Sequence, residues 1–415
     1  MTKFFNYFLN LLSKFFDSLI KFVLYLITPI IIGYEKTSEL QLFIALIFLS
    51  SVIFRFSSEI IFLKKLSDLN LNLKKFNLLI YQTLILFSKS YFVFFIILFA
   101  LYKFAKLFIN IQIYEIIENY YIYIFLNSLT FSFVAIVAFS LRALGRPNLS
   151  ILFFGSIWPS IIIILLIIES IFNYGMHFII KNFTIYFLLI GISISIYFFY
   201  FVNHKFVFKK YEKKYTKLKT DRLNSYIQSI GSIFINWVPI IIFSFYNDKI
   251  SSGIFATYFK FGLGLLYFIN VVDLISAKKL SYYFQIKNRI KLKKTYNEFK
   301  VLKIISAIMI FFLSYIFFKI YDHYFSSANI EYTLYLYIAL ILLCGFFGPI
   351  DISFLLFNKE KLLAKNNIFL IISIIIILNL TCQYFGILGS LISFSIILLI
   401  NYTYKYFILK KLNYV

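Results

Sequence analysis

Hydrophobic stretches follow one another along almost the whole chain and are separated by short polar connections. A helix that crosses the roughly 30 Å hydrocarbon core of a bilayer needs about 20 apolar residues, and twelve stretches reach about that length. The pattern therefore predicts an all-α polytopic membrane protein with twelve transmembrane helices. Their approximate ranges are 13–33, 40–58, 77–101, 117–141, 151–170, 184–203, 224–246, 251–274, 301–319, 333–357, 367–385 and 387–407.

The basic residues fall on alternate connections between these stretches. One side of the predicted bundle holds 33 lysines and arginines and the other side holds six, with Lys89 and Lys260 inside predicted spans. Lysine and arginine collect in cytoplasmic loops and set the orientation of a membrane protein. We therefore expect both termini to be cytoplasmic.

Composition supports a membrane protein and excludes several other classes. The chain of 415 residues is 62% hydrophobic and 14% charged, whereas soluble domains are about 45–50% apolar and about 25% charged. A soluble enzyme, a disulfide-stapled secreted module and a disordered protein are therefore excluded. The net charge of +24 is explained by topology, so we expect no nucleic-acid partner. Cys344 and Cys382 lie in apolar runs, and we expect both to be buried.

The sequence carries no motif for catalysis or metal binding. It has no phosphate-binding loop and no pair of histidines in zinc-binding spacing. The connections on the side with six basic residues are too short to hold a catalytic domain. We therefore expect no enzyme activity, no metal and no cofactor.

Two short sequences recur at nearly half the chain length. Pro29–Ile32 recurs as Pro239–Ile242, and Lys64–Ser67 recurs as Lys278–Ser281. Because each pair occupies the same place in the order of spans, we predict two six-helix halves related by a parallel pseudo-twofold repeat around a central hydrated cavity. The predicted domains are an N-terminal bundle at 1–203, a basic cytoplasmic linker at 204–223 and a C-terminal bundle at 224–415.

Polar and charged side chains inside the spans indicate what lines this cavity. A charge in hydrocarbon costs at least about 2.5–3.5 kcal/mol, so Lys260 and Lys89 are expected to face water or a ligand. Helical spacing places further polar residues on shared faces, although small polar residues also hold membrane helices together without lining a cavity. The predicted cavity-lining polar residues are Gln228, Ser232, Asn236, Thr257 and Tyr267.

A cavity that contains ammonium groups favours an anionic ligand. Lysine and arginine attract phosphate through charge-assisted hydrogen bonds. More basic residues are expected at the cytoplasmic mouth, where anchoring of the topology is an equally good explanation for them. An acidic residue precedes each recurring lysine pair and is a predicted partner of this basic mouth. The mouth residues are Arg55, Lys64, Arg142 and Arg146, and the acidic partners are Glu59 and Asp273.

Four segments carry a resemblance to a known family. The chain resembles a polysaccharide flippase of the O-antigen (Wzx) type, within the multidrug/oligosaccharidyl-lipid/polysaccharide (MOP) exporter superfamily, whose fold is MATE-like. The resemblance covers essentially the whole chain. The segments are Ser140–Asn148, similar to the turn between helices 4 and 5; Ser58–Lys64, similar to the end of helix 2; Gly253–Phe261, similar to helix 8; and Tyr384–Ser390, similar to the turn between helices 11 and 12.

This resemblance implies a function. The substrate would be an undecaprenyl-pyrophosphate-linked oligosaccharide, an O-antigen or capsule repeat unit, moved from the cytoplasmic to the periplasmic leaflet of a bacterial inner membrane by alternating access. Lys260 and Lys89 would bind the pyrophosphate. The implied partners are the lipid-linked substrate, the bilayer and polysaccharide polymerase machinery. The chain departs from the family at Ile275–Ala277, where many relatives have a proline, and Lys89 does not match a family position.

Three other functions stay open at this point. A cation-coupled small-molecule exporter of the same superfamily would use Asp17 and Asp351 to carry a proton or sodium, while the span 224–246 offers only the amides Gln228 and Asn236. A lipid II flippase resembles this chain in chemistry but has fourteen helices. A membrane polymerase or glycosyltransferase would need a large outer loop.

Overall fold

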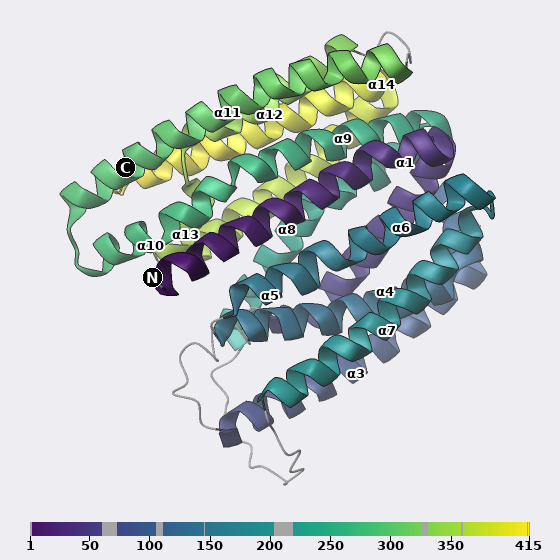
Figure 1. The fold of residues 1–415 in the computed structure, drawn as a ribbon, viewed down its shortest axis with the longest axis horizontal. Coiled ribbons are helices and arrows are strands. Elements are labelled where there is room, and N and C mark those ends of the chain that lie inside the picture. Colours follow the sequence, from purple (N-terminus) through teal and green to yellow (C-terminus); the bar gives the residue numbers. More distant parts are fainter. Residues whose placement is uncertain are drawn as a thin grey trace. The chain divides into compact units, whose positions relative to one another are not determined.

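A computed structural model describes residues 2–59, 73–104, 111–144, 146–202, 219–325, 331–357, 360–412 and 414. Every regular element among these residues is a helix, and the chain divides into two compact units, Met1–Gly253 and Ile254–Val415 (Figure 1). The prediction of an all-α polytopic membrane protein is confirmed. The expected linker at 204–223 lies mostly outside the described residues, and the three predicted domain ranges stay a prediction.

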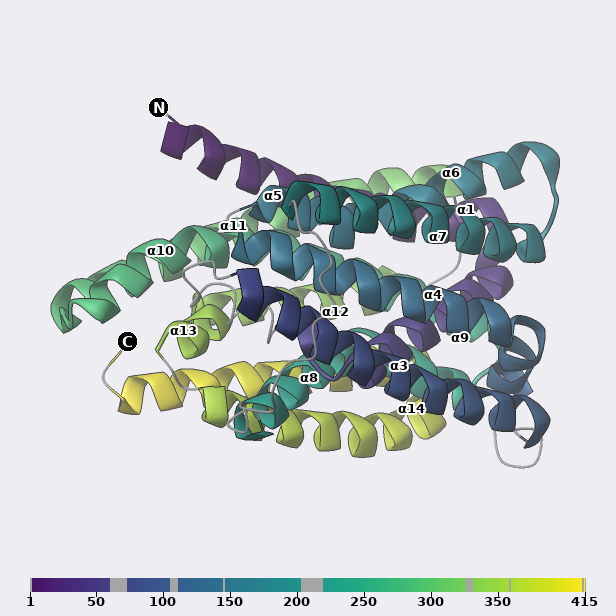
Figure 2. The ribbon, with the colours of Figure 1, turned by 90° about the horizontal axis from the view of Figure 1, so that it is seen from below.

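The first unit is built from long helices and one irregular turn. Figure 2 shows α4 between α3 and α7, and α4 also packs against α1. The elements are α1 (Thr2–Arg55), α3 (Leu73–Phe104), α4 (Ile111–Ala143), α5 (Pro147–Ile151), the π-helical turn η2 (Leu152–Ser156), α6 (Ile157–Phe172), α7 (Met176–Val202), α8 (Lys219–Tyr246) and the first turn of α9 (Lys249–Ile269).

The second unit holds the rest of α9 and the helices that follow it. The predicted span 333–357 is broken in the structure by a 3₁₀ turn. The elements are α10 (Val271–Gln285), α11 (Arg289–Phe325), α12 (Glu331–Leu343), the 3₁₀ turn η3 (Cys344–Phe347), α13 (Ile350–Leu356) and α14 (Glu360–Lys411).

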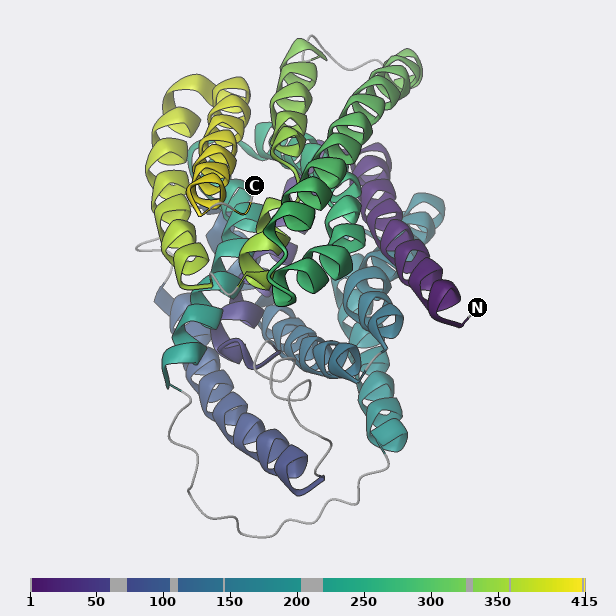
Figure 3. The same cartoon turned by 90° about the vertical axis from the view of Figure 1, so that its left-hand side faces the viewer.

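Nine helical segments among the described residues are long and apolar enough to cross a membrane. The first and last are 44 and 51 residues long, whereas about 20 residues are enough for one crossing. Each is interrupted at a glycine with positive φ, Gly33 at 77° and Gly386 at 58°. Figure 3 shows the two arms of α14, yellow-green and yellow, running side by side. Gly386 lies in the predicted connection between spans 367–385 and 387–407, and Gly33 is the last residue of the predicted span 13–33. The total of twelve crossings stays a prediction.

Aromatic packing forms the core of the first unit. The ring of Phe48 on α1 lies 4.5 Å from Phe131, 5.3 Å from Trp158 and 5.0 Å from Trp237, measured between ring centroids. These partners come from α4, α6 and α8, so one phenylalanine joins four helices. Aromatic pairs at such distances contribute about 0.5–1.5 kcal/mol each beyond their buried area. This core explains why α8, which we expected in the C-terminal bundle, lies in the first compact unit.

Backbone contacts of a buried tyrosine organise the second unit. The hydroxyl of Tyr337 on α12 donates to the carbonyl of Phe259 on α9 at 2.9 Å. Gly262 lies directly against the same ring, where a larger residue would collide with it. Phe394 on α14 packs edge-on against Phe259 at 4.8 Å. Both cysteines are buried, as expected from the apolar runs around them.

We predict that Gly253→Ala destabilises the first unit. A Cβ at Gly253 would collide with the backbone carbonyl of Tyr34, and backbone yields less readily than a flexible side chain. Overpacking of this kind costs about 1–3 kcal/mol, which exceeds the helix-propensity gain of about 1 kcal/mol. Thermal unfolding in detergent should show a lower Tm than wild type. Ser193→Ala, at an exposed site on α7, is the control, and an equal Tm in both variants contradicts the prediction.

Candidate functional site

The structure buries Lys260 in the membrane-spanning part of α9. Lys260 is only 3% exposed, and its ammonium lies 6.0 Å from the centroid of the Phe259 ring. Thr257, one turn earlier, is also buried. Lys89 differs, because it is exposed on α3. The two lysines thus have different surroundings, and their shared role in a cavity stays a prediction.

The remaining predicted residues are scattered over both units. Gln228 and Asn236 on α8 and Tyr267 on α9 are half-buried. Lys64 lies outside the described residues, as does the side chain of Ser232.

Arg142 and Arg146 are exposed at the turn between α4 and α5. The guanidinium of Arg142 lies 4.9 Å from the ring centroid of Phe139. Arg55, the third described residue of the predicted mouth, is buried instead.

A buried aspartate on α1 sits between two lysines of the same helix. Asp17 is 2% exposed, and its carboxylate oxygens lie 2.8 Å from Lys14 Nζ and 2.6 Å from Lys21 Nζ. The π-helical turn η2 brings Gly155 directly against this carboxylate, where any Cβ would collide with it. π-helical turns occur often at functional sites. The group of three side chains carries a net charge of +1.

A second group of charged side chains lies at the C-terminal end of α1. Arg55 Nε lies 3.0 Å from Glu59 Oε2, and both residues are buried. Ser229 on α8 donates to Glu59 Oε1 at 3.3 Å. Arg55 Nη1 is buried without a hydrogen-bond partner among the described residues. The role of Glu59 as an acidic partner of the basic mouth stays a prediction.

In the second unit, a lysine from α11 reaches the break between α12 and α13. Lys303 is 1% exposed, and its ammonium lies 2.8 Å from Asp273 Oδ1 on α10. It also donates to the carbonyl of Gly348 at 3.2 Å. That carbonyl is available because η3 ends at Gly348, with φ at 77°, and Pro349 follows it. A helix break supplies an acceptor that an unbroken helix would keep for itself.

A fourth group uses the first turn of α13. Asp351 Oδ1 lies 2.7 Å from Lys405 Nζ, and Tyr402 donates to Asp351 Oδ2 at 3.1 Å. Both partners come from the second arm of α14. Lys300 on α11 contacts the same arm of α14, with its ammonium 4.7 Å from the ring centroid of Tyr406. The aspartates at 17, 273 and 351, which are those with described side chains inside spans, thus each pair with at least one lysine.

Sequence reasoning missed the lysines of these pairs. From the sequence, Lys14, Lys303 and Lys405 count only toward topology, and Lys21 shares a polar helical face with Asp17 without being predicted as its partner. The spacing of Lys14 and Lys21 around Asp17, at three and four residues, is the local signal that reveals such a group. The other two lysines have no local signal, because 30 or more residues separate each from its aspartate.

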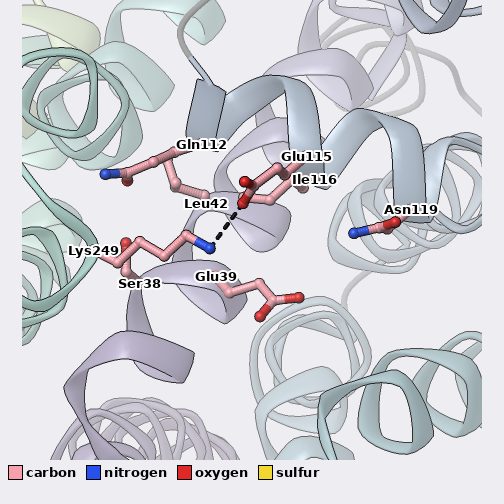
Figure 4. Close-up of a pocket in the computed structure, with 8 residues that line it drawn as sticks. All are labelled: Ser38, Glu39, Leu42, Gln112, Glu115, Ile116, Asn119 and Lys249. Atoms are coloured by element: carbon pink, nitrogen blue, oxygen red, sulfur yellow. Dashed lines mark ion pairs between the residues drawn. The ribbon is translucent and has the colours of Figure 1, made fainter.

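A pocket opens at the opposite end of the first unit from the Arg55 group. It has a volume of about 100 Å³, and its lining comes from α1, α4 and the start of α9 (Figure 4). Lys249 Nζ lies 2.8 Å from Glu115 Oε2 across it. Gln112 donates to the carbonyl of Asn247 at 2.7 Å, so the turn between α8 and α9 is fixed to α4 beside the pocket. Sequence reasoning did not find this site.

No family model matches the chain, and no curated protein matches its sequence. Solved structures match it over nearly its whole length. The lipid II flippase MurJ in an inward closed conformation aligns with a TM-score of 0.67 and 17% identity, covering 97% of this chain and 87% of that chain. The MATE multidrug transporter DinF-BH aligns with a TM-score of 0.65 and 15% identity, covering 97% and 94%. The fold is that of the MATE and MurJ transporters.

A third solved structure with the MATE-like fold also aligns with the chain. A MOP superfamily transporter from Pyrococcus furiosus, for which a reverse polarity of the binding pocket suggests a different function, aligns with a TM-score of 0.58 and 14% identity, covering 97% of this chain and 96% of that chain. One fold therefore accommodates pockets of different polarity. The charges inside this chain, and not its fold, have to decide its substrate.

We predict that the Asp273–Lys303 pair is strongly coupled, because its side chains are only 14% and 1% exposed. Asp273→Asn or Lys303→Met alone leaves one buried charge without its partner, which costs about 2 kcal/mol or more. The double variant removes both charges and should regain at least half of that loss. Thermal unfolding of the three variants in detergent measures the coupling.

The exposed Glu115–Lys249 pair is the matched control. Exposed ion pairs contribute about 0–1 kcal/mol, so Glu115→Gln, Lys249→Met and their double variant should differ little from wild type. Additive effects at Asp273 and Lys303, of the size seen in this control, contradict the predicted coupling.

Proposed function

We propose that this protein is a flippase that moves an undecaprenyl-pyrophosphate-linked oligosaccharide from the cytoplasmic to the periplasmic leaflet of a bacterial inner membrane. The observation that carries the proposal is the sign of the charge inside the spans. Lys260 is buried in α9, and the three span aspartates with described side chains are each paired with lysine. An interior of this kind suits an anionic headgroup.

The Asp17 group supports this choice of substrate. Two ammonium groups around one carboxylate leave a net positive charge next to the π-helical turn η2. Hydrogen bonds between ammonium and phosphate oxygens are stronger than neutral hydrogen bonds because both partners are charged. A pyrophosphate near this group would gain from the excess cation, whereas a cationic drug would be repelled.

The second candidate function, cation-coupled export of small molecules, needs a carboxylate that can take up a proton or sodium. Asp17 and Asp351 are the predicted carriers. Their carboxylates already lie within 2.8 Å of lysine ammonium groups, so an inorganic cation would have to compete with a tethered one. Cation-coupled export stays open as a function, because MATE multidrug transporters share this fold. The ion-coupling role of Asp17 and Asp351 stays a prediction.

The length of the match to the lipid II flippase bears on the choice between two kinds of lipid-linked cargo. The chain covers 87% of MurJ and 94% of DinF-BH. The smaller share of MurJ agrees with a chain of about twelve helices and not fourteen. We therefore favour a polysaccharide repeat unit as the cargo over lipid II.

The predicted binding residues take distinct parts in this proposal. Lys260 would hold the pyrophosphate within the membrane, together with Lys89, as we predict from the sequence. Arg55 would take part in capture at the cytoplasmic mouth, because its buried Nη1 has a hydrogen to donate while its Nε faces Glu59. Arg142, Arg146 and Lys64 would raise the local concentration of the anionic headgroup. The polar residues on α8 and α9 would contact sugar.

We predict that Lys260→Gln lowers export about 10- to 100-fold without preventing insertion. Loss of one charge-assisted hydrogen bond costs about 1.5–3 kcal/mol, which corresponds to about a 10- to 100-fold loss of transport. The measurement is surface polysaccharide in a strain that lacks its own O-antigen flippase. Lys260→Arg is the control, because it keeps the positive charge. Wild-type surface polymer in Lys260→Gln would refute the role of this lysine.

We also predict that flipping responds to membrane potential and not to sodium. Moving one negative charge outward gains about 2.3 kcal/mol per 100 mV, or about 50-fold in the equilibrium distribution. Purified protein in proteoliposomes should flip a fluorescent undecaprenyl-pyrophosphate oligosaccharide faster under a potassium–valinomycin potential of the correct sign. Replacement of sodium by choline should leave the rate unchanged. A rate that follows sodium or a proton gradient favours the cation-coupled exporter instead.

A further inference from the structure

The pocket between α1, α4 and α9 combines several hydrogen-bonding groups in a small volume. Figure 4 shows the carboxylates of Glu39 and Glu115 and the amide of Asn119 facing the same space. Ser38, Leu42, Gln112, Ile116 and Lys249 complete the lining. The site lies wholly within the first unit, at the end that the distribution of basic residues predicts to face away from the cytoplasm.

The carboxylates of the pocket are held in place by groups around it. Tyr120 donates its hydroxyl to Glu39 Oε1 at 2.7 Å, and Lys249 pairs with Glu115. Each carboxylate therefore keeps an oxygen for a further partner. The pocket is thus preorganised and rich in acceptors.

Ser38 provides an observation independent of the acidic residues. It is 1% exposed and lines the pocket, yet its Oγ has no hydrogen-bond partner among the described residues. A buried hydroxyl without a partner costs about 1–3 kcal/mol. A ligand with a hydroxyl or carbonyl group at this place would remove that cost.

The chemistry of the pocket favours a neutral polyhydroxyl ligand over a metal ion. Lys249 already supplies a cation between the carboxylates, and the described residues include no group of three or more histidine, cysteine, aspartate or glutamate side chains that could hold a metal. The groups that remain are donors and acceptors together: a serine hydroxyl, an amide and carboxylate oxygens. The apolar side chains of Leu42 and Ile116 can contact the C–H face of a sugar ring, as in many small-molecule sites.

We infer that this pocket is a second, outer binding site for a single sugar ring, separate from the predicted headgroup site at Lys260. Glu39 and Asn119 bind adjacent sugar hydroxyls, and Ser38 bonds to a third group. The choice of a sugar as ligand rests on the proposed function, since the cargo would present its sugars on this side after translocation. The site would then hold the oligosaccharide while the pyrophosphate leaves the membrane interior.

The test measures sugar binding directly. Full-length protein in nanodiscs is mixed with the methyl glycosides of glucose, galactose, rhamnose and N-acetylglucosamine, and saturation-transfer NMR reports which of them bind. The inference expects a signal for at least one glycoside, weakened about fivefold or more in Glu39→Gln and in Ser38→Ala, where hydrogen-bonding capacity is lost. Glu118→Gln is the matched control, because Glu118 is exposed on α4, bonds to Tyr114 and does not line the pocket.

The possible results distinguish the site from the proposed function. Absence of signal for all four glycosides, or equal signals in wild type and both pocket variants, overturns the inference. Calcium binding by calorimetry that is lost in Glu39→Gln, without any glycoside signal, also overturns it in favour of a cation site. The proteoliposome flipping assay is run in parallel on wild-type protein. Sugar binding without flipping supports the site and contradicts the proposed function, and flipping without sugar binding does the reverse.

Discussion

The cost of a charge in hydrocarbon is the constraint on which the rest of this structure depends. Each span aspartate with a described side chain is paired with lysine. Asp17 pairs with two residues of its own helix, and Asp273 and Asp351 pair with Lys303 and Lys405 from the helix that follows each in the chain. Removing one partner from such a pair is costly because the other is left uncompensated. In the second unit the pairs of Asp273 and Asp351 each join two helices, whereas the Asp17 group joins residues of one helix.

Irregular backbone makes these pairs possible. The π-helical turn at Gly155 lets α1 and its buried carboxylate approach closely, since any Cβ there would collide with Asp17. The break at Gly348 exposes a carbonyl that accepts from Lys303. Non-helical backbone at membrane depth is tolerated only where protein or water satisfies its polar groups. In this chain, lysine side chains and tyrosine hydroxyls satisfy them.

The fold identifies the architecture of this protein, whereas the charges inside it bear on the cargo. Multidrug transporters and a lipid II flippase have the same architecture as this chain, so architecture alone leaves the cargo open. Our proposal of an anionic headgroup rests on the charges inside the spans. The outer pocket adds a site of mixed donors and acceptors at the other end of the first unit.

The sequence by itself determined the membrane class, the helical architecture and the approximate position of the spans, because hydrophobic length and basic loops are local properties. It also singled out Lys260 as a charge inside a span. Only the tertiary structure decided that Lys303 and Lys405 are partners of aspartates, since pairs 30 and 54 residues apart depend on how helices pack. The same holds for the pocket, whose walls come from three helices distant in sequence. Local periodicity fixes each helix, whereas contacts between helices follow from packing that no single stretch of sequence contains.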